Sequence, residues 1–242
     1  MLHSSYAKHK NRLKQCYDVI KDQADVIFSV SKSLLNFFDD QPNVYWVPNG
    51  VDLKHYNKKF TLINRDIADL PKPIIGYIGV IQEKVDLELV KYLARKNPEK
   101  SIVLVGPVWN EQDEAKMSLE QEKNVHFLGY KKYSNAPMYI QQFDIGIIPH
   151  KKAGFAASTN PMKMYEYLAC GKPVVATSNI GTENVEEMIS TVDSYEDFNI
   201  EVNKLLDHDN EENRQKRHDF VKKFSWINTV NKMMDLINNK LT

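Results

Sequence analysis

Cysteine and net charge are what this 242-residue sequence has least of. Its two cysteines, Cys16 and Cys170, are far apart and have no C-x-x-C spacing, so they support neither a disulfide framework nor a zinc site. The 32 basic and 32 acidic residues cancel, so the basic excess of a nucleic-acid-binding protein is missing. We therefore expect no nucleic-acid partner, and the few cysteines fit a reducing cytosol.

Long hydrophobic runs are also missing. No apolar stretch is long enough to span a bilayer, and the first six residues lack the hydrophobic region of a signal peptide. We therefore expect no transmembrane segment and a cytoplasmic location, with a peripheral position at the membrane as an alternative. The length is sufficient for one large α/β domain with appendages.

From residue 74 onward, short β-branched runs alternate with amphipathic stretches. The predicted strands are 74–78, 102–105, 125–128, 145–148 and 173–176, and the predicted helices between them include 86–95, 136–143 and 161–169. This alternation is typical of βαβ units around a parallel sheet. The predicted fold class is therefore α/β, with a doubly wound, Rossmann-like parallel sheet of five strands. A short polar helix over 112–121 has no certain register.

The two ends of the chain have a different pattern. We expect a helix over 13–22 and strands over 26–30 and 44–47, followed by a polar linker over 51–72. Helices are predicted over 195–206, 211–224 and 226–238. The last of these has apolar residues on one face, namely Trp226, Val230, Met233, Met234 and Ile237. Such a face needs a partner if it is exposed.

The start of the predicted helix 161–169 carries the most informative side chains. Asn160 is a candidate N-cap, and Pro161 suits the first helical position. A helix start beside the carboxyl ends of parallel strands favours phosphate binding. Lys163 can neutralise a diphosphate, and Glu166, on the same face, can accept hydrogen bonds from two ribose hydroxyls. Spacing alone favours an ordinary Lys-Glu surface pair, so the nucleotide interpretation depends on context.

That context comes from four stretches in a fixed order. Residues 160–177 (NPMKMYEYLACGKPVVAT) resemble the donor-site signature of the group-1 family of retaining GT-B glycosyltransferases. Residues 47–52, 103–107 and 125–130 resemble the family's hinge, a core strand and the strand before its nucleobase loop. The Ser225-Trp226 pair also resembles the start of the family's last helix. The joint order is more specific than any single motif.

The resemblance implies two Rossmann-like domains, of which the C-terminal one binds a nucleotide sugar and the N-terminal one an acceptor. We expect residues 1–50 to be a remnant of the N-terminal domain, 51–72 a linker, 73–225 the nucleotide-sugar-binding domain, and 226–242 a helix that crosses back. Most of the acceptor-binding half would then be missing. A separate chain that supplies it is one alternative, and the acceptor itself is unknown.

The same resemblance assigns residue roles. Lys163 and Lys84 would act in catalysis by stabilising the departing diphosphate. The expected donor-binding residues are Gly79, Gly129, Tyr130, Asn160, Pro161, Lys163, Met164 and Glu166. The implied activity is transfer of a sugar from a nucleoside diphosphate sugar to an acceptor hydroxyl, with retention, in surface polysaccharide or glycolipid synthesis. We expect no metal site and no cofactor besides the donor substrate.

Several features depart from the family pattern. Many relatives have a glutamate where this sequence has Ser158, and an arginine where it has Val80, although Lys84 stands at the family's lysine position. These departures keep two other interpretations open: a non-catalytic or truncated nucleotide-sugar-binding module, and a GT-B sugar-nucleotide epimerase. His150, which precedes two lysines, is interpreted as part of a solvated loop, and His55 and His126 are interpreted in the same way.

Overall fold

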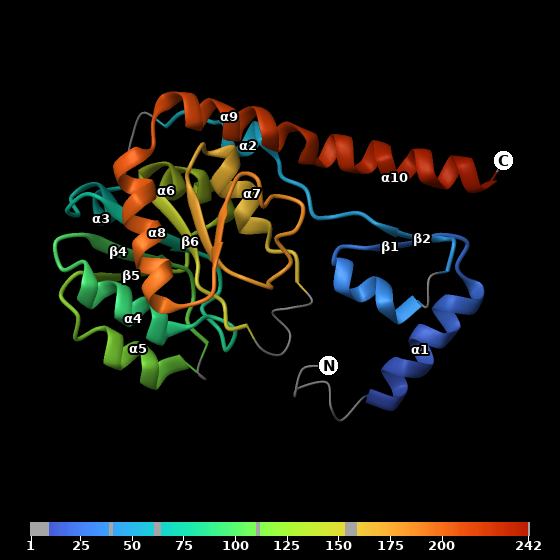
Figure 1. Cartoon of the computed structure of the whole chain (residues 1–242), viewed down its shortest axis with the longest axis horizontal. Coiled ribbons are helices and arrows are strands. Elements are labelled where there is room, and N and C mark those ends of the chain that lie inside the picture. The colour runs from blue at the N-terminus through green and yellow to red at the C-terminus, as the bar shows by residue number, and fades with distance from the viewer. Residues whose placement is uncertain (1–9, 39–40, 61–63, 110–111, 153–158, 242) are drawn as a thin grey trace.

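A six-stranded parallel sheet forms the centre of the molecule (Figure 1). The computed structural model describes residues 10–38, 41–60, 64–109, 112–152 and 159–241. The strands are β3 (Ile74–Ile78), β4 (Ser101–Val105), β5 (Val125–Gly129), β6 (Ile145–Ile148), β7 (Val174–Thr177) and β8 (Ser190–Val192), in the order β5-β4-β3-β6-β7-β8. Every neighbouring pair is parallel. The predicted α/β class with a doubly wound parallel sheet is therefore confirmed.

The count of five strands was wrong, because β8 was not predicted. This strand holds only Ser190, Thr191 and Val192, all of them partly exposed at the edge of the sheet. Two of its three residues are polar, so it lacks the apolar run by which the buried strands were found.

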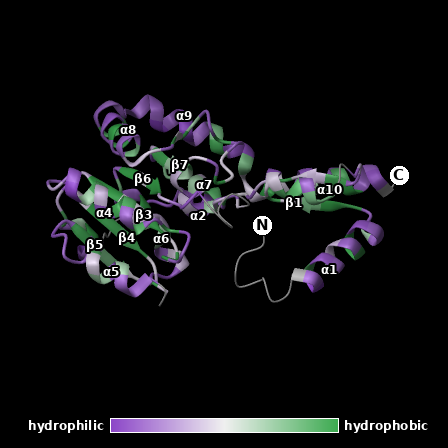
Figure 2. Ribbon diagram, turned by 60° about the horizontal axis from the view of Figure 1, so that its bottom comes forward, coloured by the Kyte–Doolittle hydropathy of each residue, from purple (hydrophilic) through white to green (hydrophobic). Residues whose placement is uncertain are grey.

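Helices cover both faces of the sheet. They are α4 (Leu87–Lys96), α5 (Asp113–Leu119), α6 (Ala136–Gln142), α7 (Met162–Ala169), α8 (Tyr195–His208) and α9 (Glu211–Val221). Along β4, Ile102 and Leu104 belong to one buried cluster, and Val103 and Val105 belong to the other. This alternation follows from the two-residue period of a strand. Figure 2 shows the apolar strands enclosed by helices whose outer faces are hydrophilic.

The N-terminal part forms a separate small unit. It contains α1 (Lys10–Gln23), β1 (Ile27–Ser29), a 3-10 helix η2 (Lys32–Phe38) and β2 (Val44–Trp46), with β1 and β2 paired in parallel. The last helix, α10 (Trp226–Leu241), extends toward the side of the molecule that holds this unit (Figure 1). Among the described residues, no helix combines the length and apolar character that crossing a membrane would require.

The segment 51–72, predicted as a polar linker, packs onto the sheet. It contains two short helices, α2 (Leu53–Tyr56) and α3 (Arg65–Ala68). Val51, Tyr56 and Ile67 are buried in the same cluster as Val103 and Val105. Helices of four residues are too short to produce a periodic apolar pattern, so this packing could not be predicted from periodicity.

The segment that follows β2 and the segment that precedes α10 lie side by side where the N-terminal unit meets the sheet. The backbone N–H of Val51 donates to the carbonyl of Phe224 at 2.9 Å, and that of Trp226 donates to the carbonyl of Val51 at 3.1 Å. A side-chain carbon at Gly50 would lie 2.9 Å from the Trp226 ring. The start of α10 is therefore fixed against the segment that leads out of β2.

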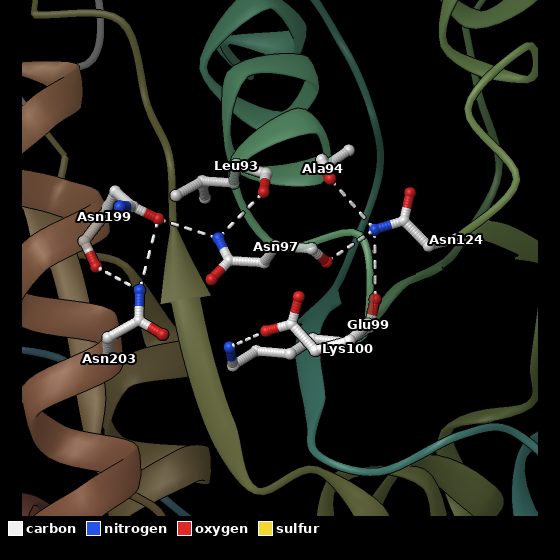
Figure 3. Close-up of polar contacts among 8 residues, drawn as sticks. All are labelled: Leu93, Ala94, Asn97, Glu99, Lys100, Asn124, Asn199 and Asn203. Carbon is white, nitrogen blue, oxygen red and sulfur yellow. Dashed lines mark hydrogen bonds and ion pairs between the residues drawn. The ribbon is translucent and has the colours of Figure 1, made fainter.

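An asparagine network lies at the amino ends of the strands, opposite to their carboxyl ends (Figure 3). The amide of Asn124 donates to the carbonyls of Ala94, Asn97 and Lys100 at 2.9–3.1 Å. The amide of Asn97 donates to the carbonyl of Leu93 at 2.9 Å and to the side chain of Asn199 at 2.7 Å. These side-chain donors add to the C-cap of α4, where the carbonyls of Leu93 and Ala94 also accept from the backbone N–H of Asn97.

An Asn97→Leu variant should be less stable than the wild type. Asn97 is 1% exposed, and leucine cannot make its two side-chain hydrogen bonds, so the change should cost about 1–3 kcal/mol of unfolding free energy. Urea unfolding measures this loss. Asn203→Ala is the control, because the Asn203 amide bonds only within α8. An Asn97→Leu loss no larger than that of the control would contradict the role of the network.

Candidate functional site

Helix α7 directs two charged side chains toward the carboxyl ends of the strands. Lys163 and Glu166 stand one turn apart on it, and both line cavities at that edge. The predicted cap was wrong by one residue: Pro161 is the N-cap, the helix begins at Met162, and Asn160 does not cap it.

Asn160 has a different role, because its side chain is buried and fully bonded. Its Oδ1 accepts from the backbone N–H of Asn49 and from the hydroxyl of Tyr165, both at 2.9 Å. Its Nδ2 donates to the carbonyl of Gly181 at 2.9 Å. The Nδ2 of Asn49 in turn donates to the carbonyl of Asn160 at 2.7 Å. The start of α7 is thus joined to the segment that leads out of β2.

Two adjoining cavities open at this edge of the sheet. One, of about 350 Å³, is lined by residues that include Asn49, Gln82, Lys84, Thr159, Asn160, Pro161, Met162 and Lys163. The other, of about 300 Å³, is lined by residues that include Tyr56, Val105, Gly106, Pro107, Tyr130, Lys131 and Tyr133. Ile78, Gly79, Val80 and Glu166 line both. Together they form one elongated site over the end of β3.

Bare backbone forms the floor between the two cavities. Gly79 and Gly106 have φ angles of +136° and +142°, which side chains other than glycine rarely permit. A side-chain carbon at Gly106 would lie 2.1 Å from the carbonyl oxygen of Gly79, and one at Gly79 would lie 3.3 Å from Nζ of Lys163. Only glycine therefore allows this close approach of backbone and lysine.

Lys84 and Lys163, the two lysines of the larger cavity, have no ion-pair partner among the described residues, whereas Lys131 in the other cavity pairs with Asp66. Nζ of Lys163 lies 4.9 Å from the ring centroid of Tyr77, within the range of a cation–π contact. Burial and the nearby charge of Lys84 lower the pKa of Lys163 to about 8, against the opposing effect of Glu166. Burial also lowers the pKa of Lys84. Two neighbouring ammonium groups without carboxylate partners suit a polyanionic ligand.

Glu166 connects the charged cavity to an aromatic one. Burial raises the pKa of its carboxyl group, and a hydrogen bond from the Tyr56 hydroxyl and the charge of Lys163 partly offset that rise. The Tyr56 ring contacts Tyr133 edge-on at 6.2 Å, and the His55 ring stacks on Tyr133 at 4.2 Å. The carboxylate of Glu166 is thus an acceptor shared by the lysine-lined cavity and the cavity lined by aromatic rings.

The sequence pattern of the glycosyl transferases group 1 family matches residues 72–208. This chain belongs to that family. It is 31% identical over 145 residues to a putative teichuronic acid biosynthesis glycosyltransferase, TuaH, of Bacillus subtilis. That match covers 60% of this chain and 36% of TuaH, so the chain spans about a third of that curated relative.

Solved structures show that the fold of this group-1 chain is shared more widely. Anabaena HepE in complex with UDP has a TM-score of 0.77 and 18% identity, covering 98% of this chain and 71% of HepE. Sucrose-phosphate synthase of Thermosynechococcus elongatus has a TM-score of 0.73 and 19% identity, covering 95% and 61% of the two chains. The resemblance to group-1 GT-B glycosyltransferases is thereby confirmed.

The structure of this group-1 chain brings together most of the predicted site residues. Lining the cavities are Gly79, Lys84, Tyr130, Asn160, Pro161, Lys163 and Glu166. Gly129 precedes Tyr130, and its carbonyl accepts from the N–H of Gly106 at 2.9 Å. Met164 lines neither cavity: its side chain is fully buried in the core, and its N–H donates to the carbonyl of Pro161. Ser158, the family's glutamate position, lies outside the described residues.

Several residues at this group-1 site were missed or misjudged. The solvated-loop interpretation was wrong for His150, which is 0% exposed, and for His55, which is 6% exposed, while His126 is half-buried. His150 is covered because the chain beyond β6 stays paired with the segment before α4, and the two lysines that follow it gave a false sign of exposure. Tyr56 was missed because it stands in the supposed linker.

Among the described residues, no three His, Cys, Asp or Glu side chains gather as a metal site would require.

Proposed function

We propose that the two cavities bind a nucleoside diphosphate sugar and that the chain takes part in transferring the sugar to an acceptor hydroxyl. The observation that carries this proposal is the convergence of Lys84 and Lys163 on one cavity without a carboxylate partner among the described residues. Ammonium groups held in this way are available to phosphate. The cavity volumes of about 350 and 300 Å³ fall in the range of small-molecule sites.

Each part of the site suits one part of such a donor. Lys163, Lys84 and the start of α7 would bind the diphosphate, and Glu166 would accept hydrogen bonds from the ribose hydroxyls. Tyr130 and the backbone of Gly129 would contact the base. When the glycosidic bond breaks, negative charge develops on the diphosphate, and the two ammonium groups would stabilise it. These charges would take the place of a metal ion, and the family resemblance suggests retention at the sugar.

The acceptor would bind mainly to the N-terminal domain, of which residues 1–50 would be a remnant. The small unit of β1 and β2 would contribute to an acceptor-binding domain, and a separate chain that supplies the rest of that domain is one alternative. TuaH is named for teichuronic acid biosynthesis, which supports a role in surface polysaccharide synthesis. Such a role would fit a cytoplasmic location, with a peripheral position at the membrane as the alternative.

Nucleotide binding should appear as a rise in melting temperature. At a concentration of one hundred times its dissociation constant, a ligand adds about 2.7 kcal/mol to the unfolding free energy. UDP is the first ligand to test, because the solved HepE structure holds it, and GDP, ADP and their sugar conjugates follow. A rise with one base would support the proposal and identify the nucleotide. A melting temperature that none of these nucleotides raises would overturn the proposal.

Binding without transfer is the second candidate, favoured by Ser158 at the family's glutamate position. It predicts a rise in melting temperature but no release of nucleoside diphosphate from the sugar conjugate, with or without an acceptor. Interconversion of free nucleotide-sugar isomers would instead indicate an epimerase.

A further inference from the structure

His150 is a fully buried histidine whose two ring nitrogens have no hydrogen-bond partner among the described residues. Buried polar groups are nearly always bonded, and one left without a partner costs stability. An imidazole offers one donor and one acceptor when neutral. A residue that keeps both unused in the interior of a domain therefore needs a reason other than packing.

Backbone contacts fix His150 at the carboxyl ends of the strands. His150 pairs with Val85 in an antiparallel bridge, and the carbonyl of Lys84 accepts from the N–H of Lys151 at 2.8 Å. On the other side, the hydroxyl of Thr177 donates to the carbonyl of His150 at 2.6 Å. The residue is thus held between the segment that carries Lys84 and the end of β7.

Lys163 lies at the same edge. It reaches over the end of β3, where its ammonium contacts the Tyr77 ring and approaches Gly79, and β3 is the strand next to β6. Burial and the charges of Lys163 and Lys84 keep the pKa of His150 well below its usual value, so the ring is neutral. A lysine ammonium has three N–H donors and no acceptor, so the interaction open to it with a neutral imidazole is as the donor.

We propose that His150 is a positioning residue for the diphosphate subsite, whose neutral ring accepts a hydrogen bond from the Lys163 ammonium when that group turns from the Tyr77 ring toward the bound diphosphate. One N–H of Lys163 would then bind His150, and the others would face phosphate oxygens. This inference rests on the proposed function, because it takes the ligand of the cavity to be a diphosphate. It explains why an unbonded imidazole is kept beside two lysines.

The test compares His150→Met with His150→Gln, two variants of nearly equal size, of which only Gln has an oxygen that can accept the lysine proton. Isothermal titration with UDP should show about tenfold weaker binding for Met and a change within about threefold for Gln. The Met variant should melt at or above the wild-type temperature, since it removes a polar group that has no partner. Weaker binding in a more stable variant is not the result of a merely structural role.

UMP provides the second measurement, because it lacks the terminal phosphate. The ratio of UDP to UMP affinity should fall in His150→Met and hold in His150→Gln. Equal losses for UDP and UMP, or wild-type affinity in the Met variant, would overturn the role of His150 and leave the proposed function intact. If the Met variant does not fold, a fall in the ratio of UDP to UMP affinity in a folded Gln variant overturns the role of His150 instead. Wild-type protein that binds none of UDP, GDP and ADP would overturn the proposed function and this inference with it.

Discussion

A Lys163→Met variant should bind its nucleotide about 10- to 100-fold more weakly than the wild type while keeping its fold, since hydrogen bonds to a charged group are worth about 1.5–3 kcal/mol each. Methionine keeps the length of the stem over the Tyr77 ring and removes only the charge. The ammonium it replaces has no ion-pair partner among the described residues, so no ion pair is broken, although loss of its charge should raise the pKa of Glu166 further. Titration calorimetry with UDP, or with whichever nucleotide raises the melting temperature, measures the effect.

The pH dependence of binding supplies a check on the same group. Burial and Lys84 lower the pKa of Lys163 to about 8, and the charged form is the one that binds phosphate. Wild-type affinity should therefore decrease as the pH rises through about 8, and the decrease should be smaller in Lys163→Met. Lys91→Met is the matched control, because Nζ of Lys91 bonds to the Ser118 hydroxyl on the outer helices. Equal affinity in the Lys163 and Lys91 variants would rule out the diphosphate role.

Gly106→Ala should destabilise the protein by about 3 kcal/mol or more and weaken nucleotide binding as well, because it adds overpacking to backbone strain. Its φ angle of +142° belongs to a region that is nearly restricted to glycine, and the added carbon would lie 2.1 Å from the carbonyl oxygen of Gly79. Gly79 cannot retreat freely, because its own N–H donates to the carbonyl of Val105 at 2.8 Å. Relief of the clash must therefore move the floor shared by the two cavities.

Gly129→Ala separates strain from overpacking. Gly129 has a φ angle of +65°, but a side-chain carbon there meets no atom within 4 Å. That variant should cost only the left-handed backbone conformation, about 1–2 kcal/mol. Thermal unfolding and nucleotide titration of both variants measure the difference. If Gly106→Ala proves no more harmful than Gly129→Ala, the close approach of Gly106 to Gly79 does not shape the site.

Sequence patterns predicted which residues line the cavities best where a local signal coincided with a regular element. Lys163 and Glu166 were predicted from one clear helix after a buried strand together with the family resemblance, and Lys84 was predicted from the resemblance alone. The strands that position them are apolar runs with buried neighbours on both faces. These are features of short stretches of chain, and short stretches are what a sequence displays directly.

The residues that sequence patterns misjudged depend on contacts between distant segments. Tyr56 reaches Glu166 across 110 positions, and nothing in its polar neighbourhood predicts burial. His150 is enclosed by segments near Lys84 and Thr177, while its sequence neighbours are lysines. Met164 shares a helix with Lys163 but faces the core, since adjacent helical residues point about 100° apart. Such placements follow only from the assembled fold.

The pair of hydrogen bonds between Asn49 and Asn160 would link ligand binding to chain orientation. Asn49 lines the lysine cavity and also belongs to the segment that leads out of β2. A ligand that binds more tightly when Asn49 holds this position must favour, by the same free energy, the orientation of β1 and β2 that brings Asn49 there. Conversely, an acceptor that reorients those strands must change the affinity for the ligand in the cavity. Ligand binding in the cavity and the orientation of β1 and β2 would then be thermodynamically linked.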